Sequence, residues 1–560
     1  MVTHGVRAVR LLGVVVPTGL LAIVVALLFA APVTVAVGSA SPALLRVAAT
    51  PLTITGSTPP NPYANGMPAT VALGQTSLDA DGCPSSVQAN TACQSTGVAV
   101  DLHGDVWVAD RANNRVLEYV PPFRTNMSAS LVLGQSSFTS SAGATNRSGF
   151  DQPSGVAFDP AGDLWVADSA NDRVVEYVPP FHNGMNASLV IGEPNFNTSA
   201  FSTANASTLD FPELPVFSPS GDLFVSDYDS NRVVEFTPPF TDGEKGSVFL
   251  GQFNSTTTAP RLEPYGLEHP VGLAVSSSGN LWVTDTRHDR LLEFAPPFVT
   301  NESASLVLGQ TNFTSDISGK NGAANLWFSG PSSNGMGGVA VDRRGDVWAA
   351  DFDNNRLVEY VPPLSDDMNA SVVLGQPAFG SSTSGTSATG ESGPRGIAFD
   401  AQGDLFEAEY FNDRVLEYVP THFTVQFLEG GLSNATNWSV TFDGTTLSST
   451  TGTIAFSEPN GSYSWTVTAV GGYSENPASG VTLVNGTATP VVVVFTSSSG
   501  AFSWGWELLT SVAALLAVVS LALVVALLAR GRRPRPRPPP AAVEVPASPP
   551  ASGNPPPPSS

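Results

Sequence analysis

A polar segment that runs from an acidic residue to an arginine recurs six times in this sequence. It constrains the fold more than any other feature. In the first copy, "GDVWVADRANNRVLEYVPPF" (104–123), it extends from Asp110 to Arg115. The later pairs are Asp168 and Arg173, Asp227 and Arg232, Asp285 and Arg290, Asp351 and Arg356, and Glu409 and Arg414. The arginines are 58, 59, 58, 66 and 58 residues apart, and a period of this length indicates a repeat architecture.

Each repeat contains four short apolar runs rich in β-branched and aromatic residues. In the first repeat they are "GVAVD" (97–101), "DVWVAD" (105–110), "RVLEYV" (115–120) and "SLVLGQ" (130–135). Four strands joined by short turns are one blade of a β-propeller. No run has a 3.6-residue period, which excludes helical repeats. We therefore expect an all-β fold with a six-bladed propeller over residues 65–421.

The acid-to-arginine segment joins the second and third strands of each blade. Asp and Asn in such a turn bond to the backbone and tolerate left-handed geometry. A reaction centre needs one asymmetric set of side chains, and six equivalent turns do not supply it. We therefore interpret all twelve acids and arginines as structural.

The last repeat lacks a fourth strand, and the front of the chain carries a spare one. After "EYVP" at 417–420 the chain continues as "THF" instead of the usual "PF". "NGMPATVALGQ" (65–75) has no three strands before it, yet it matches "NGMNASLVIGE" (183–193). We expect residues 69–75 to complete the last blade, which would close the ring and remove two exposed sheet edges.

The pattern Gly-Val-Ala-Val-Asp, then Gly-Asp-x-Trp-Val-Ala-Asp, then Asn-Arg-Val resembles NHL repeats. The resemblance covers about residues 69–420 and implies a six-bladed propeller. It also implies an alternative function, because propellers of this kind include lyases with an axial metal on histidines and lactonases with an axial calcium.

Residues 422–499 follow as alternating runs at 8–12-residue spacing, which predicts a small β-sandwich. "FSEPNGSYSWTV" and "GTATPVVVVF" resemble a module of archaeal cell-surface and thermopsin-like proteins. We expect this module to be a stalk.

Both ends of the chain are apolar and indicate a membrane protein. Residues 1–40 predict a signal peptide or an N-terminal signal anchor, followed by a linker at 41–64. Residues 506–529 predict a transmembrane helix, and the Pro- and Arg-rich segment 530–560 predicts a cytoplasmic tail. The propeller and stalk should then be extracellular at the cell membrane.

Two further features agree with an extracellular location. Cys83 and Cys93 are the only cysteines, and a local disulfide is expected outside the cell. Asn-x-Ser/Thr sequons make the protein a candidate glycoprotein. These sequons begin at Asn126, Asn146, Asn186, Asn197, Asn205, Asn254, Asn301, Asn312, Asn369, Asn434, Asn437, Asn460 and Asn485.

The formal net charge is −24, which argues against a nucleic-acid partner. The acidic surface suits solubility, an acidic or salty habitat, or loose cation binding. The ectodomain holds few histidines, and only His269 directly precedes an inner strand, so a histidine-bound zinc centre is disfavoured. Residues just before the inner strands, Arg395 among them, should face the mouth of the central channel, and oxygen ligands there could bind calcium instead. The residues of this alternative metal site are Asp151, Glu213, Glu268, His269, Asn334 and Glu391.

We expect a membrane-anchored surface propeller that binds a protein, a glycan or a small molecule through its long loops. These loops span 136–154, 194–213, 253–270, 311–337 and 377–395. The longest loop holds Trp327, Phe328 and Met336, which are the first ligand-binding candidates. The alternative is an extracellular hydrolase or lyase with a divalent metal on the axis, since propellers host both functions.

Overall fold

The computed structural model describes residues 61–199, 203–318, 322–329, 336–485 and 490–497, together with 10–11 and 14–15. The chain divides into two units, Met1–Thr58 and Pro59–Ser560. In the first unit, β1 (Arg10–Leu11) pairs antiparallel with β2 (Val14–Val15). The predicted transmembrane helix and tail lie outside the described residues, as does most of the predicted N-terminal signal. Within the described residues, no helix has the length and apolar character that a membrane span requires.

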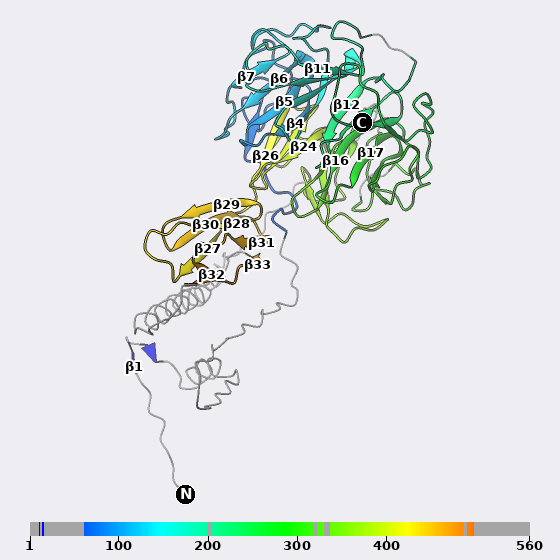
Figure 1. Ribbon diagram of the computed structural model, residues 1–560. Helices are drawn as coiled ribbons and strands as arrows, with labels where there is room; N and C mark the ends of the chain where they lie inside the picture. Colours follow the sequence, from blue (N-terminus) through cyan, green and yellow to red (C-terminus); the bar gives the residue numbers. More distant parts are fainter. Residues whose placement is uncertain are drawn as a thin grey trace, which may run out of the picture. The chain divides into compact units, whose positions relative to one another are not determined.

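Six four-stranded antiparallel sheets make up most of the described part of the chain (Figure 1). The first blade is β4 (Ser95–Val100), β5 (Val106–Asp110), β6 (Arg115–Tyr119) and β7 (Leu131–Leu133). The second is β8 (Pro153–Phe158), β9 (Leu164–Asp168), β10 (Arg173–Tyr177) and β11 (Leu189–Ile191). The third is β12 (Pro212–Phe217), β13 (Leu223–Asp227), β14 (Arg232–Phe236) and β15 (Val248–Leu250).

The other three blades repeat this order. The fourth is β16 (Pro270–Val275), β17 (Leu281–Asp285), β18 (Arg290–Phe294) and β19 (Leu306–Leu308). The fifth is β20 (Val339–Val341), β21 (Val347–Asp351), β22 (Arg356–Tyr360) and β23 (Val372–Leu374). The last is β24 (Pro394–Phe399), β25 (Leu405–Glu409), β26 (Arg414–Tyr418) and β3 (Val71–Leu73).

The first strand of each blade faces a common axis. β4 contacts β8, each later inner strand contacts the next, and β24 contacts β4, so the ring is closed. The glycine in "GVAV" is needed for this close approach. A Cβ at Gly97 would lie against the carbonyl oxygen of Ser154 in the neighbouring inner strand.

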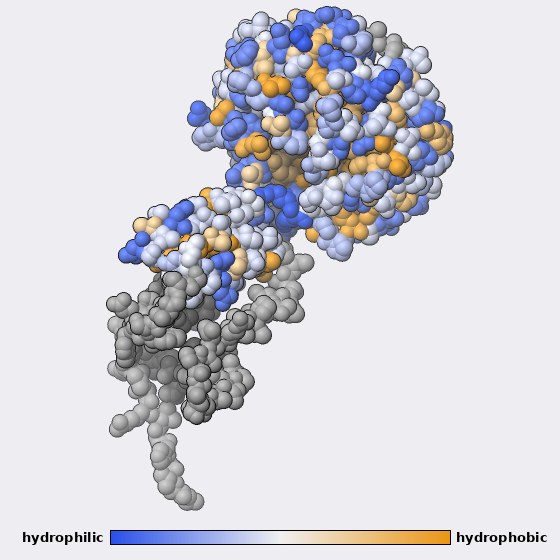
Figure 2. Space-filling model, in the orientation of Figure 1, coloured by the Kyte–Doolittle hydropathy of each residue, from blue (hydrophilic) through white to orange (hydrophobic). Residues whose placement is uncertain are grey.

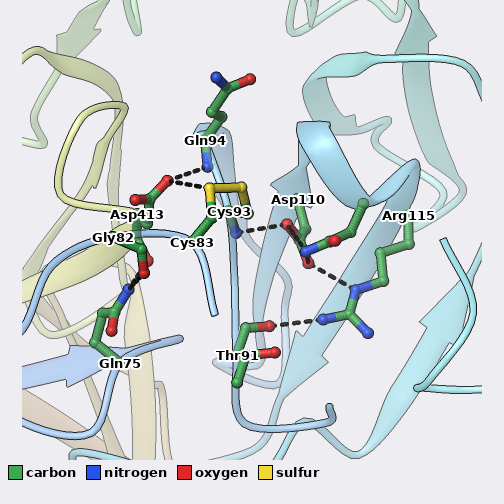
Figure 3. Close-up of a disulfide and its surroundings, with 10 residues drawn as sticks. Gln75, Gly82, Cys83, Thr91, Cys93, Gln94, Asp110, Arg115 and Asp413 are labelled. Carbon is green, nitrogen blue, oxygen red and sulfur yellow. Dashed lines mark hydrogen bonds and ion pairs between the residues drawn. A yellow bond between two sulfur atoms is a disulfide. The ribbon is translucent and has the colours of Figure 1, made fainter. Parts of the chain in front are cut away.

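The structure confirms that the front of the chain completes the last blade. β3 pairs antiparallel with β26 and aligns Leu73 with Val415 and Val71 with Glu417. The segment after β3 is also held, because Gln75 Nε2 donates to the backbone oxygen of Asp413 at 3.1 Å. Cys83 and Cys93 form the predicted disulfide beside this junction (Figure 3).

Aromatic side chains pack the blades against one another. The tryptophan in the second strand of four blades is fully buried. Trp107 meets Phe158 and Phe181 of the next blade edge-on, with ring centroids 5.8 and 4.9 Å apart. Such pairs add to the hydrophobic stabilisation that comes from burying their area.

The second module is a β-sandwich with its own core. Its strands are β27 (Phe423–Gly430), β28 (Trp438–Phe442), β29 (Thr445–Ser449), β30 (Thr453–Glu458), β31 (Gly461–Val467), β32 (Tyr473–Asn476), β33 (Ser479–Val484) and β34 (Val491–Ser497). They form two sheets, in the orders β30-β27-β34-β32 and β29-β28-β31-β33. Burial alternates along β31, as expected for a strand with one face on a core.

Deletion of residues 65–75 should open the ring. It removes the buried side chains of Ala72 and Leu73 and exposes the edge of β26. Each buried aliphatic side chain is worth about 1–3 kcal/mol, so we expect the melting temperature of the full-length protein in detergent to fall by roughly 10 °C. Deletion of 530–560 is the control and should leave it unchanged. Equal melting of the two truncated proteins would refute the closure.

Candidate functional site

The acid-to-arginine segment is a buried structural joint. Arg115 Nε donates to Asp110 Oδ2 at 2.6 Å, and both side chains are fully buried. The remaining guanidinium nitrogens donate to the backbone oxygens of Thr91 and Phe138, at 2.6 and 2.5 Å. The other five pairs form the same acid–arginine bond across their hairpins. Each joint therefore ties its hairpin to the long loops on the same face.

The same joint also positions residues of the next blade. Asn114, the residue before Arg115, accepts a hydrogen bond at its Oδ1 from the backbone N–H of Gln152, at 2.8 Å. The same contact recurs around the ring. The other pairs of acceptor and donor residues are Asp172 and Phe211, Asn231 and His269, Asp289 and Phe328, Asn355 and Gly393, and Asp413 and Gln94.

Apart from Gly393, four residues held in this way have a left-handed backbone. The φ angles of Gln94, Gln152, Phe211 and His269 are 54°, 54°, 56° and 52°. Residues other than glycine adopt such angles uncommonly, and they persist where the surrounding structure imposes them, often at functional sites. All four side chains line one pocket at the mouth of the axis.

The pocket has a volume of about 450 Å³, within the range of small-molecule sites. Below it, the inner strands of all six blades line an axial channel of about 370 Å³. Glu213, on the inner strand β12, lines both spaces and marks the floor of the pocket.

Charged side chains converge on this floor. Glu213 Oε2 accepts a short bond from Arg395 Nη2, and Glu213 Oε1 lies 4.0 Å from Arg111 Nη1. Arg111 Nη2 donates to Gln152 Oε1 at 3.0 Å, and its guanidinium lies 5.3 Å from the centroid of the Phe211 ring. Burial lowers the pKa of Arg111. Nη1 of Arg111 and Nη1 of Arg395 are buried and make no hydrogen bond.

One wall of the pocket is aromatic. The rings of Tyr228 and His269 stack with centroids 4.3 Å apart and planes at 11°. Arg287 Nε donates to His269 Nδ1 at 3.4 Å. Burial, and then the nearby Arg287, lower the pKa of His269, so this imidazole is neutral near pH 7.

The pocket residues occupy places where the repeats differ. The residue after the acid of each joint is Arg111, Ser169, Tyr228, Thr286, Phe352 or Tyr410. The second residue of the inner strand is Thr96, Ser154, Glu213, Val271 or Arg395 in five blades. An alignment of the six repeats shows that these two positions vary from blade to blade, so the sequence could have identified them as candidate site positions.

The structure does not bring the six residues of the predicted metal site together. Glu213 and His269 line the pocket. Glu268 instead faces His288 in a joint, 3.2 Å from its Nε2, and the Asp151 carboxylate lies against Gly143 of a loop. Glu391 is enclosed in the last blade, and Asn334 lies outside the described residues. Within the described residues, the acid clusters compact enough to share an ion contain none of the six.

The three predicted ligand-binding residues of the longest loop also lie in different surroundings. Phe328 is fully buried and packs with Leu326 and Val339, so it offers no surface to a ligand. The backbone N–H of Phe328 donates to Asp289 Oδ1 at 2.7 Å, and this hydrogen bond fixes the residue beside the core. Trp327 is half-buried, and its backbone N–H donates to Asp351. Met336 is the one candidate of the three that lines the pocket.

Comparisons with known proteins agree with the repeat structure. Residues 150–177 and 267–294 match the NHL repeat. The second and fourth blades therefore carry NHL repeats, and each match spans the three inner strands of its blade. No curated protein matches the sequence.

Similar solved structures include two enzymes. One is the virginiamycin B lyase from Staphylococcus aureus, at 14% identity over 60% of this chain and 97% of the lyase, with a TM-score of 0.34. The other is a gluconolactonase from Xanthomonas campestris, at 14% identity over 63% of this chain and 99% of that chain, with a TM-score of 0.37.

A separate acidic cluster lies inside the last blade. Glu391 Oε1 accepts from the Tyr418 hydroxyl at 2.8 Å, while Glu391 Oε2 and both oxygens of Glu407 are buried without a partner. In other blades the equivalent residues are apolar. Leu209 packs against Gly192 as Glu391 packs against Gly375. Val108 has the same place in β5 as Glu407 has in β25. Burial, and then neighbouring carboxylates, raise the pKa of both glutamates.

These glutamates should make the protein more stable in acid. A raised pKa in the folded state means that their contribution is complete below the ordinary glutamate pKa of about 4.3. It is lost as the pH rises through the raised values. Between pH 4 and pH 8 the melting temperature should therefore fall. In a variant with Glu391→Leu and Glu407→Val the fall should be smaller by roughly 5 °C or more.

Melting curves of the full-length protein across this pH range check the expectation. The slope should not vanish, because burial and a neighbouring acid raise the pKa of Asp210 and of Asp404 to about 7. Glu263→Gln, at an exposed position, is the control and should keep the wild-type slope. Parallel profiles for the wild type and the double variant would contradict the interpretation.

Proposed function

We propose that this chain is a membrane-anchored surface protein whose propeller binds a small ligand in the pocket at the mouth of its axis. The observation that carries the proposal is the convergence of non-repeating polar and aromatic side chains on one pocket. Gln152, Glu213 and His269 come from the second, third and fourth blades, and a shared hydrogen-bonding pattern holds the residues before these inner strands. A concave site with a few fixed polar groups is typical of small-molecule recognition.

The face of the propeller that Figure 2 shows favours a small ligand over a large protein partner. Figure 2 shows hydrophobic side chains scattered among hydrophilic ones on the visible face of the propeller. A broad apolar patch, which often marks a protein-docking surface, is not seen on that face.

The cell-surface location rests on the apolar segment at 506–529, the basic residues after it, and the sequons. Every sequon asparagine except Asn301 and Asn460 is exposed, as glycan attachment requires. In this proposal the sandwich at 422–499 is a stalk between the propeller and the membrane, and residues 530–560 are cytoplasmic.

The alternative, a hydrolase or lyase with a divalent metal on the axis, has less support. Two buried guanidinium groups, of Arg111 and Arg395, flank the carboxylate of Glu213 on the pocket floor. A divalent cation placed there would be repelled by both of them. Calcium sites use six to eight oxygen ligands, and Glu213 supplies two oxygens that already face these arginines.

A blocked pocket tests the proposal. Gln94 precedes β4 and lines the pocket, and Leu102 follows β4 at the opposite end of the same strand and is exposed. We expect a panel of neutral, cationic and anionic sugars to contain a compound that raises the melting temperature of the full-length protein. Gln94→Trp should weaken its binding at least 10-fold, and Leu102→Trp should leave it unchanged.

Binding that both variants retain would place the ligand elsewhere and overturn the proposal. A panel in which no compound shifts the melting temperature would also count against it.

A further inference from the structure

We infer that the group recognised in the axial pocket is an oxyanion, a carboxylate or a phosphate, held by Arg395 and Arg111. This inference rests on the proposed function and specifies the chemical class of its ligand. The metal site expected from the sequence contains no arginine.

The charges at the site favour an anion although the protein as a whole is acidic. Arg111, Arg287 and Arg395 lie in or under the pocket, against the two acids Glu213 and Asp229. His269 adds no charge near pH 7, since burial and Arg287 lower its pKa. The side chains that line the pocket and its floor therefore carry one more positive than negative charge, in a chain whose net charge is −24. Such a local excess attracts anions and repels cations.

The two floor arginines also have unused donors. Arg395 is 3% exposed and Arg111 is 6% exposed, and Nη1 of each is buried without a hydrogen-bond partner. A buried donor without a partner has lost its hydrogen bond to water and destabilises the unliganded site. Ligand oxygens that reach these two nitrogens would remove that destabilisation. Guanidinium groups bind carboxylates and phosphates in this way, with short charge-assisted hydrogen bonds.

Glu213 shows how such an oxyanion would be held. Its own carboxylate lies between the two guanidiniums, bonded to Arg395 and 4.0 Å from Arg111. It neutralises about one of the two positive charges and leaves the other for a ligand. Glu213 thus both pairs with the arginines and competes with an incoming anion.

The remaining walls suit a ring attached to the anionic group. The stacked pair Tyr228 and His269 and the ring of Phe211 flank the pocket, and the space is about 450 Å³. A six-membered sugar ring fits this volume. A sugar acid or a sugar phosphate therefore matches both the floor and the walls.

Titration calorimetry with matched probes tests the inference on the full-length protein. Glucuronate, glucose 6-phosphate and inorganic phosphate carry the oxyanion, glucose lacks it, and glucosamine carries the opposite charge. We expect at least one oxyanion to bind at least 10-fold more tightly than glucose, with affinity that falls as salt is added. Tighter binding of glucuronate or of the phosphates would identify the carboxylate or the phosphate as the preferred group.

Variants separate recognition from a purely structural role of the arginines. Arg395→Gln should weaken binding of the preferred oxyanion at least 10-fold, and Glu213→Gln should strengthen it several-fold because the competing carboxylate is gone. If Arg395→Gln does not fold, Arg111→Ser serves instead, since the second blade carries Ser169 at that position. Variants that lower the melting temperature without changing oxyanion affinity would show that the arginines only support the fold, and would overturn the inference.

The outcomes also distinguish this inference from the proposed function. Glucose or glucosamine binding that Gln94→Trp abolishes, without oxyanion binding, would leave the propeller a ligand-binding protein and overturn the oxyanion assignment. Failure of every probe and of the wider panel would count against both.

Discussion

The buried ion pair between the acid and the arginine of each joint is the interaction on which the rest of this propeller depends. Asp110 and Arg115 have no contact with solvent, so neither charge can be removed without leaving the other unpaired in the interior. Breaking a buried pair in this way is strongly destabilising, by about 3–5 kcal/mol. The arginine also binds loop carbonyls, and the acid binds the backbone N–H of Cys93 at 2.8 Å. One pair thus fixes the hairpin, the long loops and the entry to the inner strand.

The contrast between a constant joint and variable side chains beside it explains how a repetitive scaffold carries a site that occurs once. The joint is nearly the same in every blade. Before four of the inner strands it holds a non-glycine residue, Gln94, Gln152, Phe211 or His269, in a left-handed backbone conformation. The joint binds only the backbone N–H of that residue, so the fold does not fix which side chain stands there. Gln152, Phe211 and His269 have equivalent backbones and present an amide, a phenyl ring and an imidazole to the same pocket. Chemical variety is confined to places where the fold does not depend on it.

The last blade departs from the pattern inside its core as well as at its edge. Glu391 and Glu407 replace apolar residues, and enclosed carboxyl groups are stable there only when protonated. The acidic surface is consistent with this feature, since protonation in acid relieves the mutual repulsion of its many carboxylates. The buried glutamates and the acidic surface therefore act in the same direction, since protonation of both favours the folded state in acid.

The number of blades, the turn in each joint, the closing strand and the disulfide all followed from the sequence. These features are local or periodic, because each is encoded by residues a few positions apart or by a motif that repeats. The pocket could be predicted only in part. His269 and Glu213 were placed near the channel mouth, but Asp151 and Glu268 lie one residue before the side chains that enter the pocket, and Glu391 lies in the last blade. A left-handed residue directly before β8 and before β16 redirects the side chains there, and no local pattern shows which neighbour will face the axis.

The sequence by itself thus determined the scaffold, and only the tertiary structure decided which side chains meet on its axis. Arg395 and Glu213 are separated by 182 residues, and they touch because the ring closes. Arg111 approaches Glu213 because the first and third blades face the same narrow channel. Contacts of this kind depend on the closure of the whole ring, which no single repeat encodes, and they place two arginines beside Glu213 on the axis.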